Sequence, residues 1–476
     1  MGTISSAFDM ISGALNADQS ALSIVANNVA NANTPGYTAE TPNWRQNDPI
    51  QINGVQYGDG VTETGATSMR DSVLSARLDQ QQQLASASGA RLTALDSVQA
   101  LFTPDSGSSS STAGDIGNDV TSFFSSFSSL EAQPTNNSLR EEVLTSASTL
   151  AGDISNAAGS LSSQRSALDQ EASGVTSQVN SLTSSIAQLN QQIQSTSPNA
   201  DAGTLEDQRQ EDLSQLSQLI GINQVKTENN GLAVTTTSGQ LLVSESSSFQ
   251  LTSGSVNGAT HFFVGTTDIT SQLSAGGGEL GGYLTARDQD IPNALTSLDQ
   301  LAYGISTSVN QLNNTGSDLT GNTGTAANPL YIFNVPTQVA GSALGMAVTM
   351  TDPSQIAAAG AGMGTGDNSN AVAIAALGNE SLMGVSNGST PTGFFSNFVS
   401  TLGATVSGVQ AENTAQNASV TQLQTQNSAL TEVNLNDEAA AMSTLESSYQ
   451  AASQVFTMLN TLIASALNLG DQTTVA

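Results

Sequence analysis

Apolar residues recur at alternating spacings of four and three near both ends of the chain. This spacing places apolar side chains along one face of a helix and suits a seam between paired helices. Asp18 interrupts the first series and Glu438 interrupts the second. The positions that form these two predicted helix seams are Ile4, Phe8, Ile11, Leu15, Leu22, Val25 and Val29 at one end, and Leu435, Met442, Leu445, Tyr449, Phe456, Leu459 and Ile463 at the other.

Two interpretations of these terminal seams are open. Most stripes with this spacing belong to ordinary core helices of a bundle. Chain termini, however, are usually frayed and polar, whereas both ends of this long chain carry extended apolar seams. Their position therefore favours assembly helices that pair with each other and with copies of the same chain.

The middle of the chain alternates between helical and strand-like patterns. Helical spacing covers most of it, and the apolar series from Leu168 to Ile193 is nearly unbroken. Hairpin-type turns at Asn230-Gly231 and Ser238-Gly239, together with the apolar run His261–Val264, predict a group of strands. The predicted helices cover residues 69–102, 123–130, 138–193, 205–220, 291–312 and 394–430.

These patterns predict a mainly α protein. It has long terminal helices in a coiled-coil layer, a helical bundle domain and an inserted β-containing outer domain. The expected division is a terminal helical assembly domain of residues 1–67 and 434–476, a helical domain of residues 68–225, 280–314 and 390–433, and an outer β-containing or irregular domain of residues 226–279 and 315–389.

A distinctive string, ANNVANANTPGYT, follows the first terminal helix. Pro35 cannot continue a helix, Gly36 permits a positive φ, and Tyr37 offers an amphipathic ring to anchor the turn. A helix-end turn explains these residues physically, but the string is more specific than a turn requires. With Asn27, Asn28 and the C-terminal VNLNDEAAAM…SSYQAASQVF stretch, it resembles the flagellar axial proteins, which comprise rod, hook and hook-associated proteins.

Segments in the middle of the chain narrow this resemblance. The stretch LEDQRQEDLSQL, which contains Asp207, Gln208 and Arg209, is similar to a signature of the hook-associated protein 1 family. ELGGYLTARDQDI and the paired helices around Phe124 and Arg140 are also similar to that family. The resemblance implies a structural subunit that joins hook to filament. The chain is short for the family, which suggests a reduced outer insert around residues 315–390.

Composition excludes several classes of protein. Nine Lys+Arg against 40 Asp+Glu give a formal net charge of −31, and Lys226 is the single lysine. Such a polyanion cannot neutralise a row of phosphates, so we expect neither a nucleic-acid nor a membrane partner. The chain has no cysteine, which excludes disulfides and thiolate chemistry. No basic residue precedes Arg45, so we expect no cleavable signal with a basic n-region. The resemblance implies secretion by the flagellar export apparatus to the outside of the cell.

Candidate catalytic chemistry is sparse. His261 is the one histidine, and no nucleophile motif accompanies it, so we expect a surface or half-buried strand residue. The acidic cluster around Glu206 is expected on a solvated helix face, where Arg209 pairs with a neighbouring acid. Trp44, the only tryptophan, is expected to fill a domain junction. The sequence therefore predicts no enzyme, no cofactor and no metal site.

Three functional interpretations remain. The favoured one is a junction subunit that forms a homo-oligomeric ring, contacts the hook protein and a neighbouring hook-associated junction protein, and binds an export chaperone through its C-terminal helix; these partners are implied by the resemblance. The second is another flagellar axial protein of the hook or rod. The third is a secreted coiled-coil effector or adhesin that uses its helices to engage a host protein.

Overall fold

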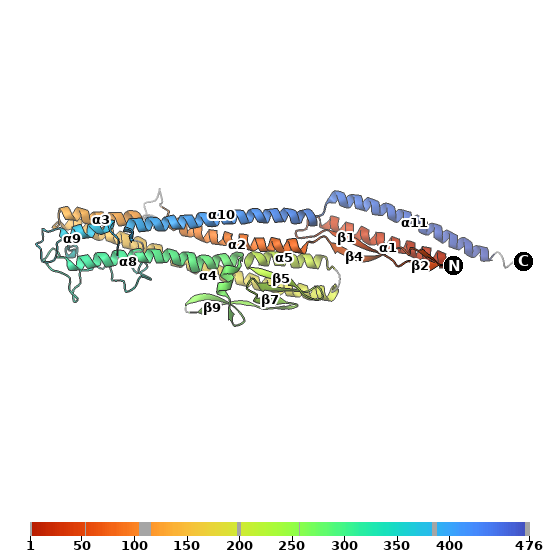
Figure 1. Ribbon diagram of the computed structural model, residues 1–476, viewed down its shortest axis with the longest axis horizontal. Coiled ribbons are helices and arrows are strands. Elements are labelled where there is room, and N and C mark those ends of the chain that lie inside the picture. Colours follow the sequence, from red (N-terminus) through yellow and green to blue (C-terminus); the bar gives the residue numbers. More distant parts are fainter. Residues whose placement is uncertain are drawn as a thin grey trace.

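The computed structural model describes residues 2–52, 54–103, 116–197, 201–256, 258–382 and 388–471. Long helices run along one axis of an elongated molecule, and the two ends of the chain lie at the same end of it (Figure 1). The expected loop at residues 105–117 lies largely outside the described residues. The fold is mainly α with a small β-containing insert, which confirms the predicted class.

Five long helices form the bundle (Figure 1). Asp71 caps the first of them by accepting hydrogen bonds from two backbone N–H groups, and Asn136 caps the third by accepting one from the Ser138 N–H. The apolar faces meet in a large cluster that includes Phe123, Phe127 and Ile154, each with no exposed surface. The helices are α2 (Ser72–Leu101), α3 (Ile116–Ala132), α4 (Asn137–Thr196), α8 (Ile291–Thr315) and α10 (Pro391–Thr431).

Helix α4 links two hydrophobic clusters. It contains 60 residues, a length of about 90 Å at 1.5 Å per residue. Its buried positions from Val143 to Leu168 belong to the bundle cluster, and those from Ala172 to Ile193 turn toward the β-containing insert. The long apolar series predicted from the sequence is therefore the shared wall of both parts.

The insert, here called the β-module, packs against the second half of α4 (Figure 1). It contains two antiparallel sheets with strand orders β5-β6-β7-β8 and β11-β10-β9. Asn229 and Asn230 adopt positive φ in its first turn, as the sequence predicts for a hairpin. Its elements are α5 (Thr204–Leu219), β5 (Ile222–Lys226), β6 (Leu232–Thr236), β7 (Leu241–Ser244), β8 (Ser247–Ser248), β9 (Leu251–Val256), β10 (Ala259–Val264), β11 (Thr267–Asp268), α6 (Thr270–Gly276) and α7 (Gly278–Thr285), followed by one π-helical turn at Ala286–Asp290.

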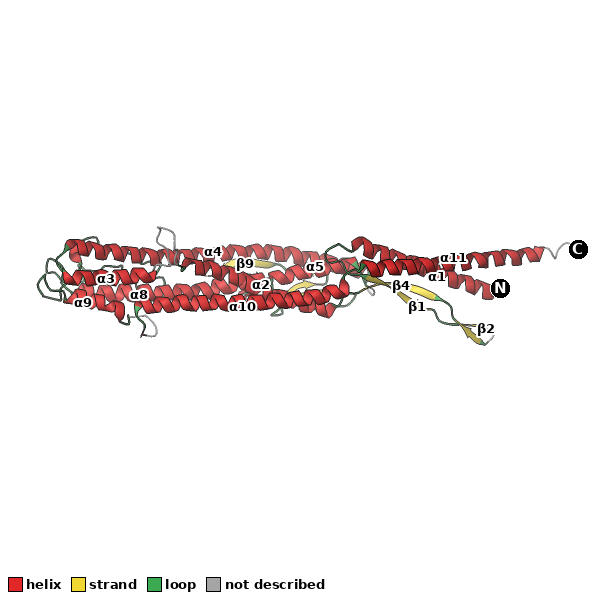
Figure 2. Cartoon of the chain, turned by 90° about the horizontal axis from the view of Figure 1, so that it is seen from above, coloured by secondary structure: helices red, strands yellow, loops and turns green. Residues whose placement is uncertain are grey.

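The two ends of the chain form a terminal layer beyond the bundle. Helices α1 (Gly2–Asn31) and α11 (Leu435–Asp471) pair side by side (Figures 1 and 2). A long antiparallel β-ribbon lies along α1; we use "ribbon" for its residues Glu40–Ser68. Its strands are β1 (Glu40–Gln46), β2 (Ile50–Ile52), β3 (Val55–Tyr57) and β4 (Val61–Ser68), paired β1 with β4 and β2 with β3.

The ribbon differs from the expectation, because residues 1–67 were predicted to belong to a terminal helical domain without strands. A strong local signal for it exists, because Asn53-Gly54 separates Ile50–Ile52 from Val55–Tyr57. Asn-Gly between two short apolar-rich runs is the most specific sequence mark of a hairpin.

Residues 315–382 close the far end of the bundle and differ from the expected outer domain. Leu330, Ile332 and Phe333 are buried in the bundle cluster, whereas residues 226–279 contribute to the second cluster. The segment contains isolated β-bridges, two short 3-10 turns at Pro353–Gln355 and Leu377–Asn379, and helix α9 (Ser369–Ala376). The side chain of Asn310 on α8 pairs with the backbone of Phe333 as a neighbouring strand would. It donates one hydrogen bond to the Phe333 carbonyl and accepts one from the Phe333 N–H.

Candidate functional site

The predicted seams meet each other along the α1–α11 pair. The rings of Phe8 and Phe456 lie 4.7 Å apart between centroids. Ala21, Val25 and Leu445 form a small buried cluster between the helices. The half-buried seam positions are Phe8, Ile11, Leu15, Leu22, Met442, Phe456, Leu459 and Ile463.

Some predicted seam residues are not brought into this contact. Val29, Leu435 and Tyr449 are 40%, 52% and 39% exposed. The side chain of Ile4 lies outside the described residues. The α1–α11 pair therefore uses part of the predicted apolar surface and leaves the rest open.

A polar junction joins the terminal layer to the bundle, and the side chain of Asn28 lies at its centre. The Asn28 side chain is 1% exposed. Its Nδ2 donates to the Glu40 carbonyl and to Glu438 Oε1, each at 2.8 Å. Its Oδ1 accepts from the Tyr37 hydroxyl at 2.8 Å and from the Glu40 backbone N–H at 3.0 Å. One amide thus ties α1, the turn after it, the ribbon and the start of α11 together.

The turn that supplies Tyr37 has the predicted geometry. Helix α1 ends at Asn31, and Gly36 adopts a φ of +78°. This region of φ is open to glycine at little cost, so Gly36 suits the turn. Pro35 is exposed at the point where the chain leaves the helix, and Asn27 accepts a 2.6 Å hydrogen bond from Asn31 on the helix surface.

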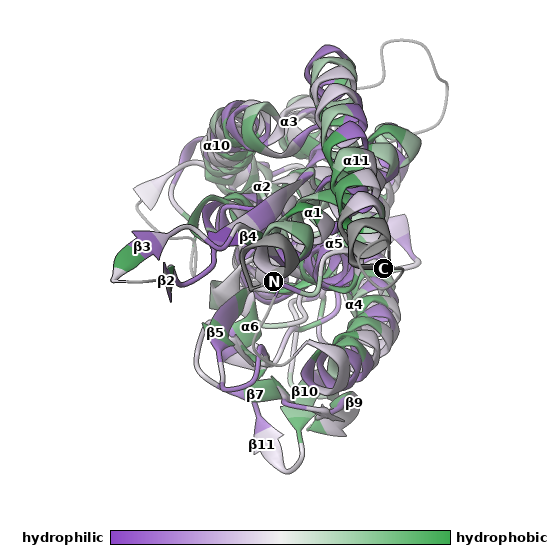
Figure 3. Cartoon of the chain, turned by 90° about the vertical axis from the view of Figure 1, so that its right-hand side faces the viewer, coloured by the Kyte–Doolittle hydropathy of each residue, from purple (hydrophilic) through white to green (hydrophobic). Residues whose placement is uncertain are grey.

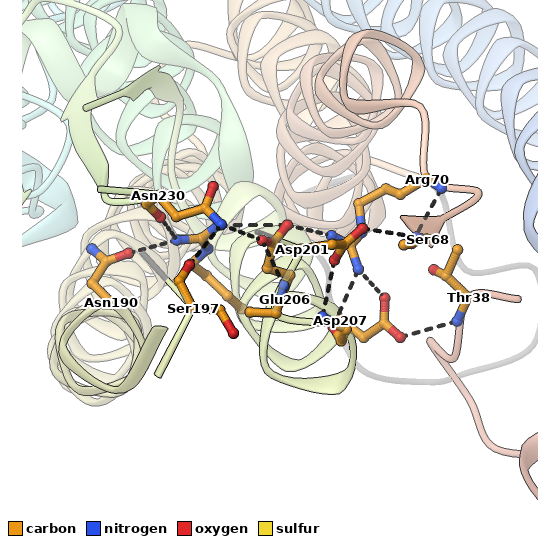
Figure 4. A network of polar contacts seen from close by, with 12 residues as sticks. Thr38, Ser68, Arg70, Asn190, Ser197, Asp201, Glu206, Asp207 and Asn230 are labelled. Atoms are coloured by element: carbon orange, nitrogen blue, oxygen red, sulfur yellow. Dashed lines mark hydrogen bonds and ion pairs between the residues drawn. The ribbon is translucent and has the colours of Figure 1, made fainter. Parts of the chain in front are cut away.

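The acidic residues of α5 complete the junction from the side of the β-module (Figure 4). Asp207 Oδ2 accepts from the Thr38 backbone N–H at 3.1 Å, and its Oδ1 pairs with Arg70. The Arg70 guanidinium also donates to Glu206 Oε2 at 2.7 Å. Arg70 lies just before α2, so these pairs fix the end of the ribbon to both α2 and α5.

Arg209 extends the network into the β-module. It donates to Asn190 Oδ1 at 2.9 Å and to the Asn230 carbonyl at 2.8 Å (Figure 4), and its second nitrogen lies 4.0 Å from Glu206. The expected pairing with a neighbouring acid is therefore present but long. Gln208 faces solvent between these two buried neighbours.

Burial among carboxylates changes proton affinity at the junction. Desolvation, with the charges of Glu40, Asp207 and Glu438, raises the pKa of Tyr37 to about 12. The Tyr37 hydroxyl therefore remains a hydrogen-bond donor to Asn28. Burial also raises the pKa of Asp79 to about 6, although Gln210 and Gln224 donate to its carboxylate.

A cleft of about 420 Å3 lies between the TPGY turn and the bundle, lined by Tyr37, Asp79, Glu211 and Asn427 among others. Within the described ranges, no group of three or more histidine, cysteine, aspartate or glutamate side chains is arranged to hold a metal ion. In the same part of the chain, no helix is both long and apolar enough to cross a membrane. The hydrogen bonds and ion pairs described at this site connect elements of the fold to one another.

One expectation about a single residue was wrong, and another was right only in part. Trp44 does not fill a domain junction, because it lies on the ribbon with 47% of its surface exposed. The acidic cluster on α5 is only partly solvated, since Asp207 is buried whereas Glu211 is exposed. His261 fits its expectation as a half-buried strand residue and lies 2.6 Å from Asp268.

Comparison with known proteins gives a consistent result. Residues 106–327 match the model of the flagellar hook-associated protein FlgK helical domain, and residues 9–38 match that of the flagella basal body rod protein. Flagellar hook-associated protein 1 of Salmonella typhimurium is 25% identical over 321 residues, covering 65% of this chain and 57% of the relative. The Escherichia coli protein of that name is 23% identical over 359 residues, covering 72% of this chain and 64% of the relative. The matched region thus spans less than two thirds of these curated relatives.

The fold has a solved counterpart. The flagellar hook junction protein FlgK from Burkholderia pseudomallei superposes with a TM-score of 0.64 at 20% identity, covering 74% of this chain and all of that one. The matched helical domain contains Asp207 and Arg209, and the rod-type match ends just after Tyr37. The junction between the terminal layer and the bundle is therefore built from residues of both matched segments. Over about two thirds of its length, the chain is therefore similar to flagellar hook-associated proteins of the FlgK type.

Proposed function

We propose that this chain is a structural subunit of the bacterial flagellum that joins hook to filament outside the cell. It assembles through α1 and α11 into a homo-oligomeric ring, and it acts by packing rather than by catalysis. The names of its curated relatives and of its solved counterpart support this role.

The observation that carries the proposal is the terminal layer. Both ends of the chain leave the bundle as one helix pair, and this pair buries few of its apolar residues within the subunit. Apolar surface that is exposed in one subunit is a natural contact for the next. The polar junction around Asn28 and Arg70 holds this pair in a fixed position on the bundle.

We infer the remaining partners from the resemblance to hook-associated proteins. The ring would contact the hook protein on one side and a neighbouring hook-associated junction protein on the other. Before assembly, an export chaperone would cover the apolar residues of α11, where Met458 and Leu462 are 60% and 59% exposed. The net charge of −31 disfavours nucleic acid and acidic membranes as partners.

The test is localisation in a strain that lacks its own junction protein. Labelled wild-type chain should appear at the tip of isolated hooks and restore filaments. Leu445→Asp places a charge in the buried contact with α1 and should abolish incorporation while leaving the bundle folded. Ser447→Asp adds the same charge at an exposed position two residues away and should incorporate normally.

Other outcomes would contradict the proposal. Labelling along the whole hook or the rod would assign the chain to another class of axial protein. Secretion without attachment to flagella would favour an effector or adhesin. Normal filaments with Leu445→Asp would show that the α1–α11 contact is not needed for assembly.

A further inference from the structure

The terminal layer carries two exposed apolar surfaces on opposite sides of α1. On the ribbon, Trp44, Val55 and Tyr57 are 47%, 53% and 51% exposed. On α11, Val455, Met458 and Leu462 are 42%, 60% and 59% exposed. Figure 3 shows the ribbon and α11 on either side of α1, and Figure 2 agrees.

The three exposed residues of α11 form one stripe, here called the outer stripe. Their spacing of three and four places them on the same helix face. This face lies beside the one that carries Phe456 and contacts Phe8 of α1. The outer stripe is therefore separate from the contact that holds α11 to its own chain.

The ribbon and the outer stripe lie at the same level along the molecule. Phe456 of α11 packs on Phe8, and Gly60 of the ribbon lies so close to Met10 that an added Cβ would be 2.9 Å from Met10 Cγ. Phe8 and Met10 are neighbours on α1. From Gly60 the ribbon continues to the β2–β3 hairpin, which reaches the level of the N-terminus, and α11 extends past that level (Figure 2).

We propose that the ribbon of each subunit packs on the outer stripe of the next subunit. This inference rests on the proposed function and names the surfaces that close the ring. A contact between two different surfaces of the same chain is heterologous, and repetition of such a contact generates a ring or helix. Two surfaces at one level on opposite sides of α1 have the placement that a ring of such contacts requires.

The chemistry of the two surfaces favours a second copy over a charged partner. From residue 439 to residue 470 the single charged residue is Glu446, so α11 offers few groups to a charged ligand. Strands β2 and β3 pair with each other alone, and a two-stranded hairpin is marginal in water without an apolar surface to cover. An exposed helical stripe supplies that surface, and Val55 and Tyr57, two residues apart on one strand, point to the same side of it.

The chain has no cysteine, so introduced thiols are the only ones that it contributes. Tyr57→Cys and Met458→Cys are combined in one chain, assembled at hook tips and treated with a mild oxidant or a short bis-maleimide. The expected product on a denaturing gel is a ladder of covalent dimers, trimers and larger species. The ladder arises because each subunit uses both surfaces, whereas an isologous contact stops at the dimer.

Matched controls define the alternatives. Each single variant should remain monomeric. Val225→Cys combined with Met458→Cys should also remain monomeric, because Val225 is equally exposed but lies on the β-module. A second pair, Val55→Cys with Leu462→Cys, repeats the test at neighbouring exposed positions if the first variant fails to incorporate.

The outcomes separate this inference from the proposed function. Double variants that reach the hook tip without forming a ladder overturn the ribbon contact and leave the proposed function intact. A covalent dimer from Met458→Cys alone overturns it in favour of contact between two α11 helices. A chain that never localises to hooks overturns both.

Discussion

Helices α4 and α11 are both long, but they are buried to very different degrees. Helix α4 has buried residues in nearly every turn and lies between two hydrophobic clusters. Along the described side chains of α11, Leu445 is the buried apolar residue. The bundle therefore completes its core within one subunit, whereas the terminal layer keeps apolar surface that one subunit does not cover.

The difference is not one of helix propensity or of sequence pattern. Both helices carry apolar residues at helical spacing, and both are mainly polar on their other faces. What differs is the number of partners that the same chain supplies, because α11 has α1 alone beside it for most of its length (Figure 1). An apolar stripe predicts a helix contact but not the chain from which its partner comes.

The largest expected contrast is between one aromatic residue from each region. Phe123→Ala removes a fully buried ring from the bundle core and should lower the free energy of unfolding by about 4 kcal/mol. Phe456→Ala removes a half-buried ring from the terminal layer and should cost the isolated subunit less than about 1 kcal/mol. Urea unfolding of purified subunits measures both. Equal losses would mean that the terminal layer is as complete in the monomer as the bundle.

Loss of Arg70 should disconnect the two regions. Arg70→Met removes the cation that pairs with Glu206 and Asp207 and leaves both largely buried carboxylates without it. The expected cost is about 3 kcal/mol, because a partner removed from a buried pair leaves an uncompensated charge. Hydrogen exchange should rise in the ribbon and at the end of α1 while the bundle stays protected. Arg77→Met, at an exposed position on α2, is the control and should change neither region.

Stability should depend on pH through Asp79, on the bundle side of the junction. Burial raises its pKa from 3.8 to about 6, so the folded state binds a proton more tightly than the unfolded chain does. Stability should therefore fall as the pH rises from about 4 to about 6, by about 2 to 3 kcal/mol, and stay lower above that range.

Asp79→Asn keeps an oxygen that accepts from Gln210 and Gln224 but carries no charge. This variant should be more stable than the wild type at pH 7 and equal to it at pH 4, as measured by urea unfolding at both values. Asp48→Asn, at an exposed position, should leave the pH profile unchanged. A wild-type profile that is flat between pH 4 and pH 6 would contradict the assignment.

The smallest effect is expected at the far end of the bundle. In the segment of residues 315–382 that closes this end, residues 361–366 are exposed, whereas the neighbouring Ala357 and Ala359 are buried. Shortening the Gly360–Gly366 tract should leave export and motility intact, as measured by secretion and swimming assays. Normal secretion with lost motility would show that this end also takes part in assembly.

The bundle could be predicted from sequence because its signals are periodic and local. The series from Val175 to Ile193 gives one face of α4, and these residues are buried as the spacing predicts except for the half-buried Leu182. The paired ends of the chain were also predictable, since two seams without another partner favour each other. Phe8 and Phe456 confirm that pairing within one chain.

The junction could not be predicted in the same way. Arg70 and Asp207 are 137 residues apart, and Asn28 and Glu438 are 410 apart. No periodicity connects such polar pairs, and each residue on its own looks like ordinary surface. The resemblance to the flagellar family marked Asn28 and Asp207, but Arg70 and Asp79 carried no signal. The ribbon is a different case, because the Asn53-Gly54 dipeptide between two short apolar-rich runs is a local sequence signal for a hairpin.

The separation of 410 residues between Asn28 and Glu438 has a consequence for synthesis and export. The first helix of the chain finds its partner only when the last forty residues have been made and delivered. Closing so large a loop is slow compared with forming the local contacts of the bundle. A chain truncated between α10 and α11 keeps every helix of the bundle but cannot form the α1–α11 pair. Under the proposed function, only a chain that carries both α1 and α11 can assemble, so the pair acts as a check that both helices are present.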